Sequence, residues 1–408
     1  MRYNILIITL LGGVIYLKKD ELGIYIHIPF CKSKCSYCDF VSYPNKVDKV
    51  EMYFNALEKE LESYNLEKYN ITTIYIGGGT PSYVDAKYIS NILNKVKIIL
   101  ANNLTSWENI EKTIEVNPGT INEEKLLMYK NAGVNRLSIG LQSTNDKLLK
   151  QIGRIHNYID FTNTYEIAKK VGFKNINVDL MLGLPNQTIQ DLKESLEEII
   201  KLNPNHVSVY SLIIEEGTKI EKQISSGELK MPDDELERQM YWYVKNTLEL
   251  NGYKHYEISN FAKNGYESKH NLNCWEQKEY VGLGVAAHSY INDTRYSNTE
   301  ILEKYIDTNF NANIWSNQDE LVKNNIRTIE EIQSLDDKKN EFMLLGFRKI
   351  EGVNITKFKE KFVDNPIFIY RDKLKKLVDQ GLIEIDLNNI KLSSKGIDLA
   401  NIVFQEFV

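Results

Sequence analysis

The sequence predicts an α/β fold, a partial (β/α)6 barrel followed by a C-terminal winged-helix-like α+β module. Six short runs rich in Ile and Val alternate with stretches of helical periodicity from residue 23 onward. Strands that alternate with helices lie parallel in one sheet, and such a sheet closes or curls into a barrel. After residue 300 the alternation stops, and helices flank one two-stranded hairpin, which predicts the second module.

The six predicted strands are four to seven residues long and are bounded by Gly, Pro or Asn, which favour turns. They cover residues 23–28, 71–76, 113–116, 136–141, 176–182 and 207–213. The first helix, predicted over residues 48–64, places Val50, Phe54, Leu57 and Leu61 on one face. Functional motifs are expected in the loops after the strands, because the chemistry of such barrels lies at the strands' carboxyl ends.

Two helix starts carry capping signatures. Thr120 with Glu123 predicts a capping box for the helix after the third strand, and Gly133 would end that helix. Thr188 and Asp191, at the same spacing, begin the helix after the fifth strand.

Composition and charge limit the class of protein. The 408 residues are 42% hydrophobic and 26% charged, which argues against disorder or a fibrous repeat. With 50 basic and 56 acidic residues the formal net charge is −6, so no nucleic-acid partner is expected. Four cysteines are too few for a disulfide scaffold, which indicates a reduced, intracellular protein.

Residues 5–17 form an apolar run behind a single arginine, which resembles the core of a signal peptide. A helix of that length reaches roughly 20 Å, short of the roughly 30 Å hydrocarbon core of a bilayer. No small-residue cleavage site follows, so we interpret the run as a passenger segment or as a weak peripheral membrane contact. The predicted organisation is an apolar extension over residues 1–20, a barrel over 21–255, a connecting region over 256–300 and the winged-helix-like module over 301–408.

Three cysteines, Cys31, Cys35 and Cys38, follow the first predicted strand at spacings of four and three residues. Three thiolates on one short loop can hold three corners of a 4Fe–4S cluster and leave the fourth iron open. An open iron can chelate an amino and a carboxylate group, the pattern that S-adenosylmethionine needs. The alternatives are a zinc site, with His27 or the remote Cys274 as fourth ligand, and a chance grouping of buried cysteines. We expect His27 to orient the loop rather than take part in chemistry.

The string YIHIPFCKSKCSYCDF over residues 25–40 resembles the radical S-adenosylmethionine superfamily. Within it, the resemblance is to the coproporphyrinogen dehydrogenase-like branch and its HemW-type haem chaperones, and it runs from residue 23 to the C-terminus. It implies a 4Fe–4S cluster, S-adenosylmethionine and haem as cofactors, an electron donor for the cluster, and haem-acceptor proteins as partners. It also implies a cytoplasmic location, and leaves open membrane association and a dimer.

A glycine-rich loop, residues 77–81, follows the second strand, Glu115 and Gln142 end the third and fourth strands, and Asp179 lies in the fifth. Backbone N–H groups of such a loop can hold a carboxylate. By resemblance, Gly78, Gly79 and Thr80 hold the methionine end of S-adenosylmethionine, and Glu115 accepts from its ammonium. The remaining residues implied for the cofactor site are Tyr25 beside the adenosine, Tyr37, Gln142, Arg154 for a carboxylate and Asp179 for a ribose hydroxyl. The alternative for each acid is a strand-end residue satisfied by a neighbouring helix N-terminus.

Residues 270–275, HNLNCW, match the family's HNxxYW haem motif except that Cys274 replaces the tyrosine. The resemblance implies that His270 is an axial iron ligand and that Trp275 stacks on the porphyrin. Cys274 could supply a thiolate or lie buried and inert. The alternative for His270 is a side chain that caps a turn. Residues 282–290, GLGVAAHSY, also match a family string, and are expected either to pack tightly beside the cluster or to contact haem.

Three functions follow from these motifs. The first is a haem chaperone that retains a radical S-adenosylmethionine core. The second is an oxygen-independent coproporphyrinogen III oxidase, but that resemblance requires a fourth cysteine where this chain has Phe40, so no oxidase activity is expected. The third treats the lysine-rich C-terminal module as a nucleic-acid reader, but acidic residues interleave with those lysines.

Overall fold

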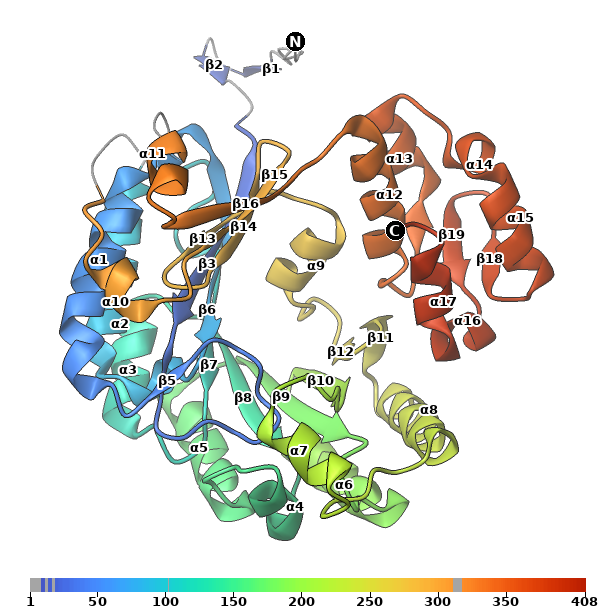
Figure 1. The fold of residues 1–408 in the computed structure, drawn as a ribbon, viewed down its shortest axis with the longest axis horizontal. Helices are drawn as coiled ribbons and strands as arrows, with labels where there is room; N and C mark the ends of the chain where they lie inside the picture. Colours follow the sequence, from blue (N-terminus) through green and yellow to red (C-terminus); the bar gives the residue numbers. More distant parts are fainter. Residues whose placement is uncertain (1–8, 12–13, 17–18, 102, 311–317) are drawn as a thin grey trace.

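The computed structural model describes residues 9–11, 14–16, 19–101, 103–310 and 318–408, and its centre is one large sheet (Figure 1). Six parallel strands form the middle of this sheet in the order β3-β6-β7-β8-β9-β10 read from β3. They are β3 (Glu21–Ile28), β6 (Asn70–Gly78), β7 (Glu111–Val116), β8 (Arg136–Gln142), β9 (Asn175–Leu182) and β10 (His206–Ser211). All six predicted strands are confirmed.

Helices cover the outer face of these strands, with the barrel interior on the other side (Figure 1). They are α1 (Val50–Ser63), α2 (Ala86–Ile99), α3 (Glu123–Asn131), α5 (Tyr158–Val171), α6 (Ile189–Leu202) and α8 (Asp234–Leu250). The short helices α4 (Asp146–Gln151) and α7 (Lys219–Ser225) lie at the carboxyl end of the strands, where they share a smaller hydrophobic cluster (Figure 1). Short 3-10 turns lie at η1 (Val47–Lys49), η2 (Leu66–Lys68) and η3 (Pro81–Tyr83). The predicted apolar face of α1 is buried against the sheet, since Val50, Phe54, Leu57 and Leu61 all belong to the core.

One of the two capping signatures is confirmed. Thr188 and Asp191 form a reciprocal capping box at the start of α6. The box at Thr120 is wrong, because α3 begins at Glu123 and its N-cap is Asn122, which accepts from the backbone N–H of Lys125 at 2.8 Å. Glu123 is therefore the first helical residue rather than the third. In a capping box it is the side chain of the third helical residue that accepts from the N-cap backbone N–H, so Glu123 cannot take that role.

The sheet continues beyond the six parallel strands on both sides (Figure 1). β12 (Asn260–Ala262) pairs antiparallel with β10 and with the edge strand β11 (Lys254–Glu257). β13 (Tyr280–Leu283) lies parallel to β3, and the antiparallel strands β14 (His288–Ile291), β15 (Thr294–Asn298) and β16 (Arg327–Ile332) follow it. The helices α10 (Leu302–Ile306) and α11 (Gln318–Lys323) lie between β15 and β16 in sequence. The predicted domain boundary at residue 301 thus passes between two paired strands.

The segment 282–288 packs tightly against the strand that precedes the cysteines. A Cβ on Gly284 would lie 2.3 Å from the Tyr53 hydroxyl and 2.8 Å from the His27 carbonyl oxygen, so only glycine fits. The Gly284 N–H donates to the buried Glu60 carboxylate at 2.7 Å, and Tyr305 donates to the same group at 2.6 Å. These contacts join α1, β13 and α10 into one rigid support for β3.

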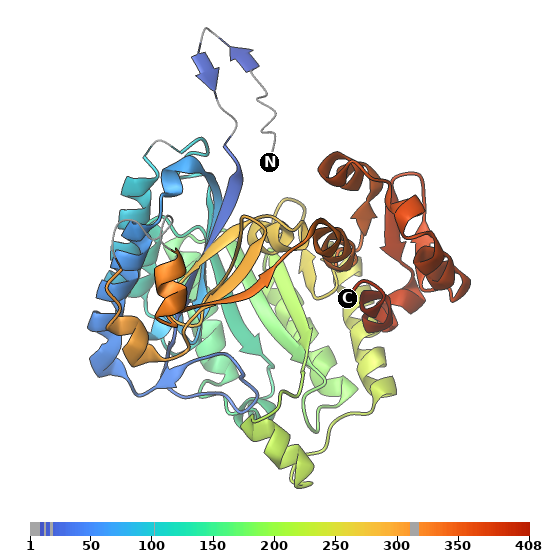
Figure 2. The same ribbon diagram turned by 45° about the horizontal axis from the view of Figure 1, so that its top comes forward.

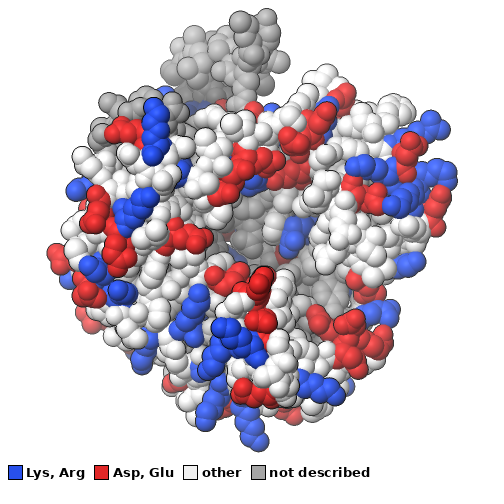
Figure 3. All heavy atoms as spheres, in the orientation of Figure 1, with Lys and Arg blue, Asp and Glu red and all other residues white. Residues whose placement is uncertain are grey.

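The C-terminal module has a hydrophobic core of its own. Its elements are α12 (Leu335–Gly346), β17 (Val353–Asn354), α13 (Ile355–Phe362), α14 (Pro366–Ile369), α15 (Arg371–Asp379), β18 (Ile383–Ile385), β19 (Asn389–Leu392), α16 (Ser394–Asp398) and α17 (Ala400–Gln405). The predicted hairpin is the antiparallel pair β18–β19, and β17 adds a third strand. Figure 2 shows this module to one side of the barrel, and Figure 3 shows acidic and basic side chains interspersed on its visible face.

Most of the predicted apolar run lies outside the described residues. Within it the structure describes two short antiparallel strands, β1 (Thr9–Leu11) and β2 (Val14–Tyr16). In the part of the chain that is described, no helix combines the length and the apolar character that crossing a bilayer requires.

Candidate cluster and cofactor site

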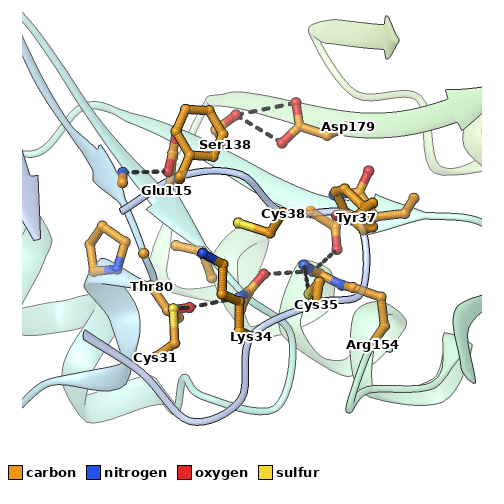
Figure 4. Close-up of a pocket in the computed structure, with 18 of the residues that line it drawn as sticks. Cys31, Lys34, Cys35, Tyr37, Cys38, Thr80, Glu115, Ser138, Arg154 and Asp179 are labelled. Atoms are coloured by element: carbon orange, nitrogen blue, oxygen red, sulfur yellow. Dashed lines mark hydrogen bonds between the residues drawn. The ribbon is translucent and has the colours of Figure 1, made fainter. Parts of the chain in front are cut away.

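The three cysteines lie on the loop that leaves β3, at the carboxyl end of the parallel strands (Figure 4). Their loop is fixed at its start by the pairing of β4 (Phe30–Cys31) with β5 (Tyr43–Pro44). In its middle, the Ser36 N–H donates to the Ile152 carbonyl oxygen at 2.9 Å, and the Ser36 carbonyl accepts from Ile220 at 2.8 Å. The sequence thus places three thiols on a loop that backbone hydrogen bonds hold against α4 and α7.

His27 holds the far end of this loop. Its Nε2 is hydrogen-bonded to the Val41 carbonyl oxygen at 2.9 Å, and its Nδ1 to the Tyr25 hydroxyl at 3.0 Å. Burial lowers the pKa of His27 to about 4, so the ring is neutral at physiological pH. These contacts support the expected role of His27 in orienting the cysteine loop.

Two polar groups contact the thiols. The Thr80 hydroxyl donates to Cys31 Sγ at 3.5 Å, and the Arg154 guanidinium donates to Cys35 Sγ at 3.7 Å. Burial raises the pKa of the Cys31 thiol and raises that of Cys38 to about 11, so iron must displace a proton to bind. Among the described residues, no three His, Cys, Asp or Glu side chains surround one metal position. Cluster ligands each bind a different iron and need not converge.

The glycines after β6 form a close backbone cradle beside the thiols. Gly78 has a φ of +110°, and a Cβ there would lie 2.6 Å from the His27 ring. A Cβ on Gly79 would lie 2.9 Å from the Pro29 carbonyl carbon and 3.0 Å from Cys31 Sγ. Glycine is therefore required at both positions for the loop to approach the cysteines.

A pocket of about 420 Å³ opens between the cysteine loop and the strand ends (Figure 4). The predicted site residues that line it are Cys31, Cys35, Tyr37, Cys38, Gly78, Gly79, Thr80, Glu115, Gln142, Arg154 and Asp179. Three thiols, a glycine cradle and convergent polar groups around one cavity fit a 4Fe–4S cluster with S-adenosylmethionine.

Two partly buried carboxyl groups form the floor of the pocket. Glu115 accepts from the Tyr75 hydroxyl at 2.9 Å and from the Gly78 N–H at 3.2 Å. Asp179 accepts from the Ser138 hydroxyl at 3.2 Å. Burial, with the nearby charge of Asp179, raises the pKa of Glu115 to about 7, and burial raises that of Asp179 as well. A ligand ammonium at this floor would draw Glu115 into its ionised form.

Arg154 is the guanidinium in the pocket wall. It donates to the Asn117 side-chain oxygen at 2.5 Å and to the Gly140 carbonyl oxygen at 2.8 Å, while its buried Nε has no protein partner among the described residues. A Cβ on Gly140 would lie 3.0 Å from this guanidinium, so β8 leaves room for it. Gln142, at the end of β8, has a φ of +70°, a strained conformation that is frequent at functional sites.

Six polar residues that line the pocket were not predicted from the sequence: Ser33, Lys34, Tyr75, Asn117, Ser138 and Tyr210. Alternation along the strands could have found two of them. Tyr75 precedes Gly77 by two residues and so shares its inward face, and Ser138 lies directly across from Glu115 in the register of β7 and β8.

Two predicted site residues, Tyr25 and His270, do not line the pocket. Tyr25 is inside the barrel, where its ring stacks on Tyr75 with a centroid distance of 6.3 Å. His270 lies on α9 (Lys269–Trp275), which enters the amino-terminal end of the barrel, and its side chain is hydrogen-bonded to Thr73.

The residues of the haem motif are held by protein contacts in this arrangement. His270 is 8% exposed, its ring stacks on Tyr75 at 5.1 Å, and its Nδ1 is hydrogen-bonded to Thr73, so only its Nε2 is left as a candidate iron ligand. Burial raises the pKa of Cys274 to about 11, so its thiol is protonated in this arrangement. Trp275 packs under the Arg348 guanidinium at 4.3 Å from the ring centroid.

Comparisons with known proteins agree with this geometry. A family model described as the radical SAM superfamily matches residues 25–199, and one described as the HemN C-terminal domain matches residues 333–399. The solved structure of coproporphyrinogen III oxidase (HemN) from Escherichia coli, a radical SAM enzyme, has a TM-score of 0.78 at 22% identity and covers 95% of this chain and 90% of that one. That likeness concerns the fold.

Curated relatives match nearly the whole chain. The heme chaperone HemW of Bacillus subtilis (strain 168) is 38% identical over 94% of this chain and 98% of the relative. The heme chaperone HemW of Lactococcus lactis subsp. lactis (strain IL1403) is 36% identical over 94% of this chain and 96% of the relative. Radical SAM membership implies a 4Fe–4S cluster and S-adenosylmethionine as cofactors. The chain therefore belongs to the HemW family of radical SAM proteins.

Proposed function

We propose that this protein is a haem chaperone, which binds haem together with a 4Fe–4S cluster and S-adenosylmethionine and delivers haem to acceptor proteins. The observation that carries the proposal is 36–38% identity, over 94% of the chain, to proteins named heme chaperone HemW. The complete three-thiol loop and the pocket beside it support the two cofactors.

Within the pocket we assign the cluster to the three cysteines and S-adenosylmethionine to the polar strand ends. The methionine end would lie on Gly78, Gly79 and Thr80, where backbone N–H groups and a hydroxyl face the thiols. Glu115 would accept from the ammonium, and Arg154 would hold the carboxylate. When bound, the cluster and cofactor supply one-electron chemistry, and an electron donor for the cluster is part of the proposal.

The remaining assignments concern the adenosine. Asp179, at the far side of the floor, would accept from a ribose hydroxyl, with Ser138 holding its carboxylate in place. Tyr37 and Gln142 line the same cavity and would bound the cofactor. Tyr25 would act only through Tyr75, since it stacks behind that ring. A dimer and a membrane contact of residues 1–20 stay predictions.

The second candidate function, an oxygen-independent coproporphyrinogen III oxidase, is favoured by the fold alone. At the position where that resemblance requires a fourth cysteine, this chain has Phe40 on the rim of the pocket with 61% of its surface exposed. An aromatic ring cannot replace a thiolate ligand. We therefore rank the oxidase second.

Paired assays on anaerobically reconstituted protein separate the two functions. Haem titration should give a saturable shift of the Soret band, and the loaded protein should pass haem to a haem-free acceptor such as apomyoglobin faster than free haem in buffer does. Incubation with coproporphyrinogen III, reductant and S-adenosylmethionine should yield no protoporphyrinogen. If protoporphyrinogen formed and haem binding were not saturable, the oxidase would become the assigned function in place of the chaperone.

A further inference from the structure

Three aromatic rings form a continuous column inside the barrel. His270 of the haem motif stacks on Tyr75 with ring centroids 5.1 Å apart and an interplanar angle of 28°. Tyr75 also stacks on Tyr25 at 6.3 Å and 27°. The His270 side chain is buried and the two tyrosines are partly buried, and the three rings join α9, β6 and β3.

The middle ring of this column reaches the floor of the cofactor pocket. The Tyr75 hydroxyl donates to one oxygen of the Glu115 carboxyl group at 2.9 Å, and the Gly78 N–H donates to the other at 3.2 Å. Tyr75 also lines the pocket directly. The direction of the Glu115 carboxyl group therefore depends on where the Tyr75 ring lies.

His270 is itself held firmly from behind. Its Nδ1 is hydrogen-bonded to the Thr73 hydroxyl at 2.9 Å, and its backbone N–H donates to the Glu111 carboxylate at 3.1 Å. Asn273, one turn further along α9, donates to the Thr72 hydroxyl at 3.2 Å. The helix and the first half of β6 thus fix the imidazole against the face of Tyr75.

We propose that His270 is a positioning residue of the S-adenosylmethionine site, which holds Tyr75 in place so that Tyr75 can orient the Glu115 carboxyl group. This inference rests on the assignment of the pocket to S-adenosylmethionine. It gives the first residue of the haem motif a role at the opposite end of the barrel. Haem ligation by His270 stays a prediction, and it requires α9 to move away from Tyr75.

The test measures S-adenosylmethionine affinity without haem, by equilibrium dialysis on anaerobically reconstituted protein with its cluster. The variants are His270→Ala, which removes the ring, His270→Phe, which keeps a stacking ring, and Tyr75→Phe, which removes the hydrogen bond to Glu115. The matched control is His255→Ala. His255 is another buried histidine, and its ring stacks on Phe261 with a centroid distance of 4.4 Å. Neither of these residues lines the pocket.

His270→Ala and Tyr75→Phe should each weaken S-adenosylmethionine binding by about fivefold or more, the lower end of coupling between separate groups. His270→Phe should restore most of the affinity, because it supports the Tyr75 ring. The double variant His270→Ala/Tyr75→Phe should have the same S-adenosylmethionine affinity as whichever single variant has the lower affinity. The losses should not multiply, because both changes act through the same hydrogen bond. Addition of S-adenosylmethionine should change the electron paramagnetic resonance signal of the reduced cluster. At a fixed cofactor concentration, this change should be smaller in the variants that bind the cofactor more weakly.

An unchanged affinity for His270→Ala, relative to His255→Ala, would overturn the proposal. So would multiplicative losses in the double variant, or a His270→Phe variant as weak as His270→Ala. Absence of cofactor binding by the unsubstituted protein would instead refute the assignment of the pocket. Because haem is left out, failure of haem transfer has no bearing on this result.

Discussion

The two ends of the barrel use similar side chains in opposite ways. At the carboxyl end, glycines and thiols surround a cavity of about 420 Å³, which Glu115, Arg154 and Asp179 also line. At the amino end, polar groups bond to each other and to α9: His206 is hydrogen-bonded to Asn177 at 2.6 Å and to Tyr256 at 2.7 Å. Inward-facing polar residues thus line a ligand site at the carboxyl end, where no helix covers them. At the amino end α9 covers them, and the helix and these residues together form a polar plug that closes the barrel.

The largest expected effect is the loss of the cluster from the carboxyl end of the barrel, with no change at the amino end. Replacing Cys31, Cys35 or Cys38 by alanine removes the ligand of one iron, so reconstituted protein should contain almost no iron or labile sulfide. The matched control is Cys274→Ala at the amino end, which should keep the full iron content. Colorimetric iron and sulfide analysis checks both. Equal iron in all four variants would show that the thiols do not hold the cluster.

A smaller effect is expected at the amino end. The Glu111 carboxylate accepts from the backbone N–H groups of Lys269 and His270 at the start of α9, and Glu111→Ala would leave both without a partner. We expect the free energy of unfolding to fall by about 2 kcal/mol. Denaturant titration measures this loss. Glu124→Ala, at an exposed helix start, should cost much less, and a similar loss in both variants would contradict the plug described here.

The smallest expected effect is a pH dependence at the carboxyl end. Burial raises the pKa of Glu115 to about 7, so the carboxyl group is mostly protonated at pH 6 and mostly ionised at pH 8. Only the ionised form can pair with an ammonium, so S-adenosylmethionine affinity should rise roughly tenfold over that interval. Asp179, Tyr75 and the Gly78 N–H surround the group. Glu115→Gln should bind weakly at both pH values, and a pH profile equal to that of the unsubstituted protein would exclude Glu115 as the titrating group.

The sequence was sufficient for the parallel strands and most of the pocket, because these depend on local patterns. The positions of Glu115 near the end of β7 and of Gly78 at the end of β6 follow from strand boundaries, whereas Asp179 lies within β9 and its role was implied by the family resemblance. The start of α3 was misassigned because Thr120 and Asn122 are both capping residues, two positions apart, and spacing does not choose between them.

The contacts of the motif at 270–275 could not be predicted, because they join residues that are far apart in the sequence. Thr73 and His270 are 197 positions apart, and no local periodicity indicates that they meet. Tyr75 lies in a strand that is largely buried on both faces, so burial alone does not mark it as a pocket residue, and only its spacing of two residues from Gly77 does. The motif at 270–275 was therefore predicted to contact haem, and its contact with the cofactor side of the barrel was not anticipated.

The strand that leads into the cysteines completes its hydrogen bonding late in synthesis. β3 has β6 on one side and β13 on the other, and β13 begins at Tyr280, more than 200 residues downstream. Until the ribosome has released that segment, one edge of β3 is an unpaired template for other chains. A nascent or truncated chain that stops before β13 would thus be prone to aggregate through the open edge of β3.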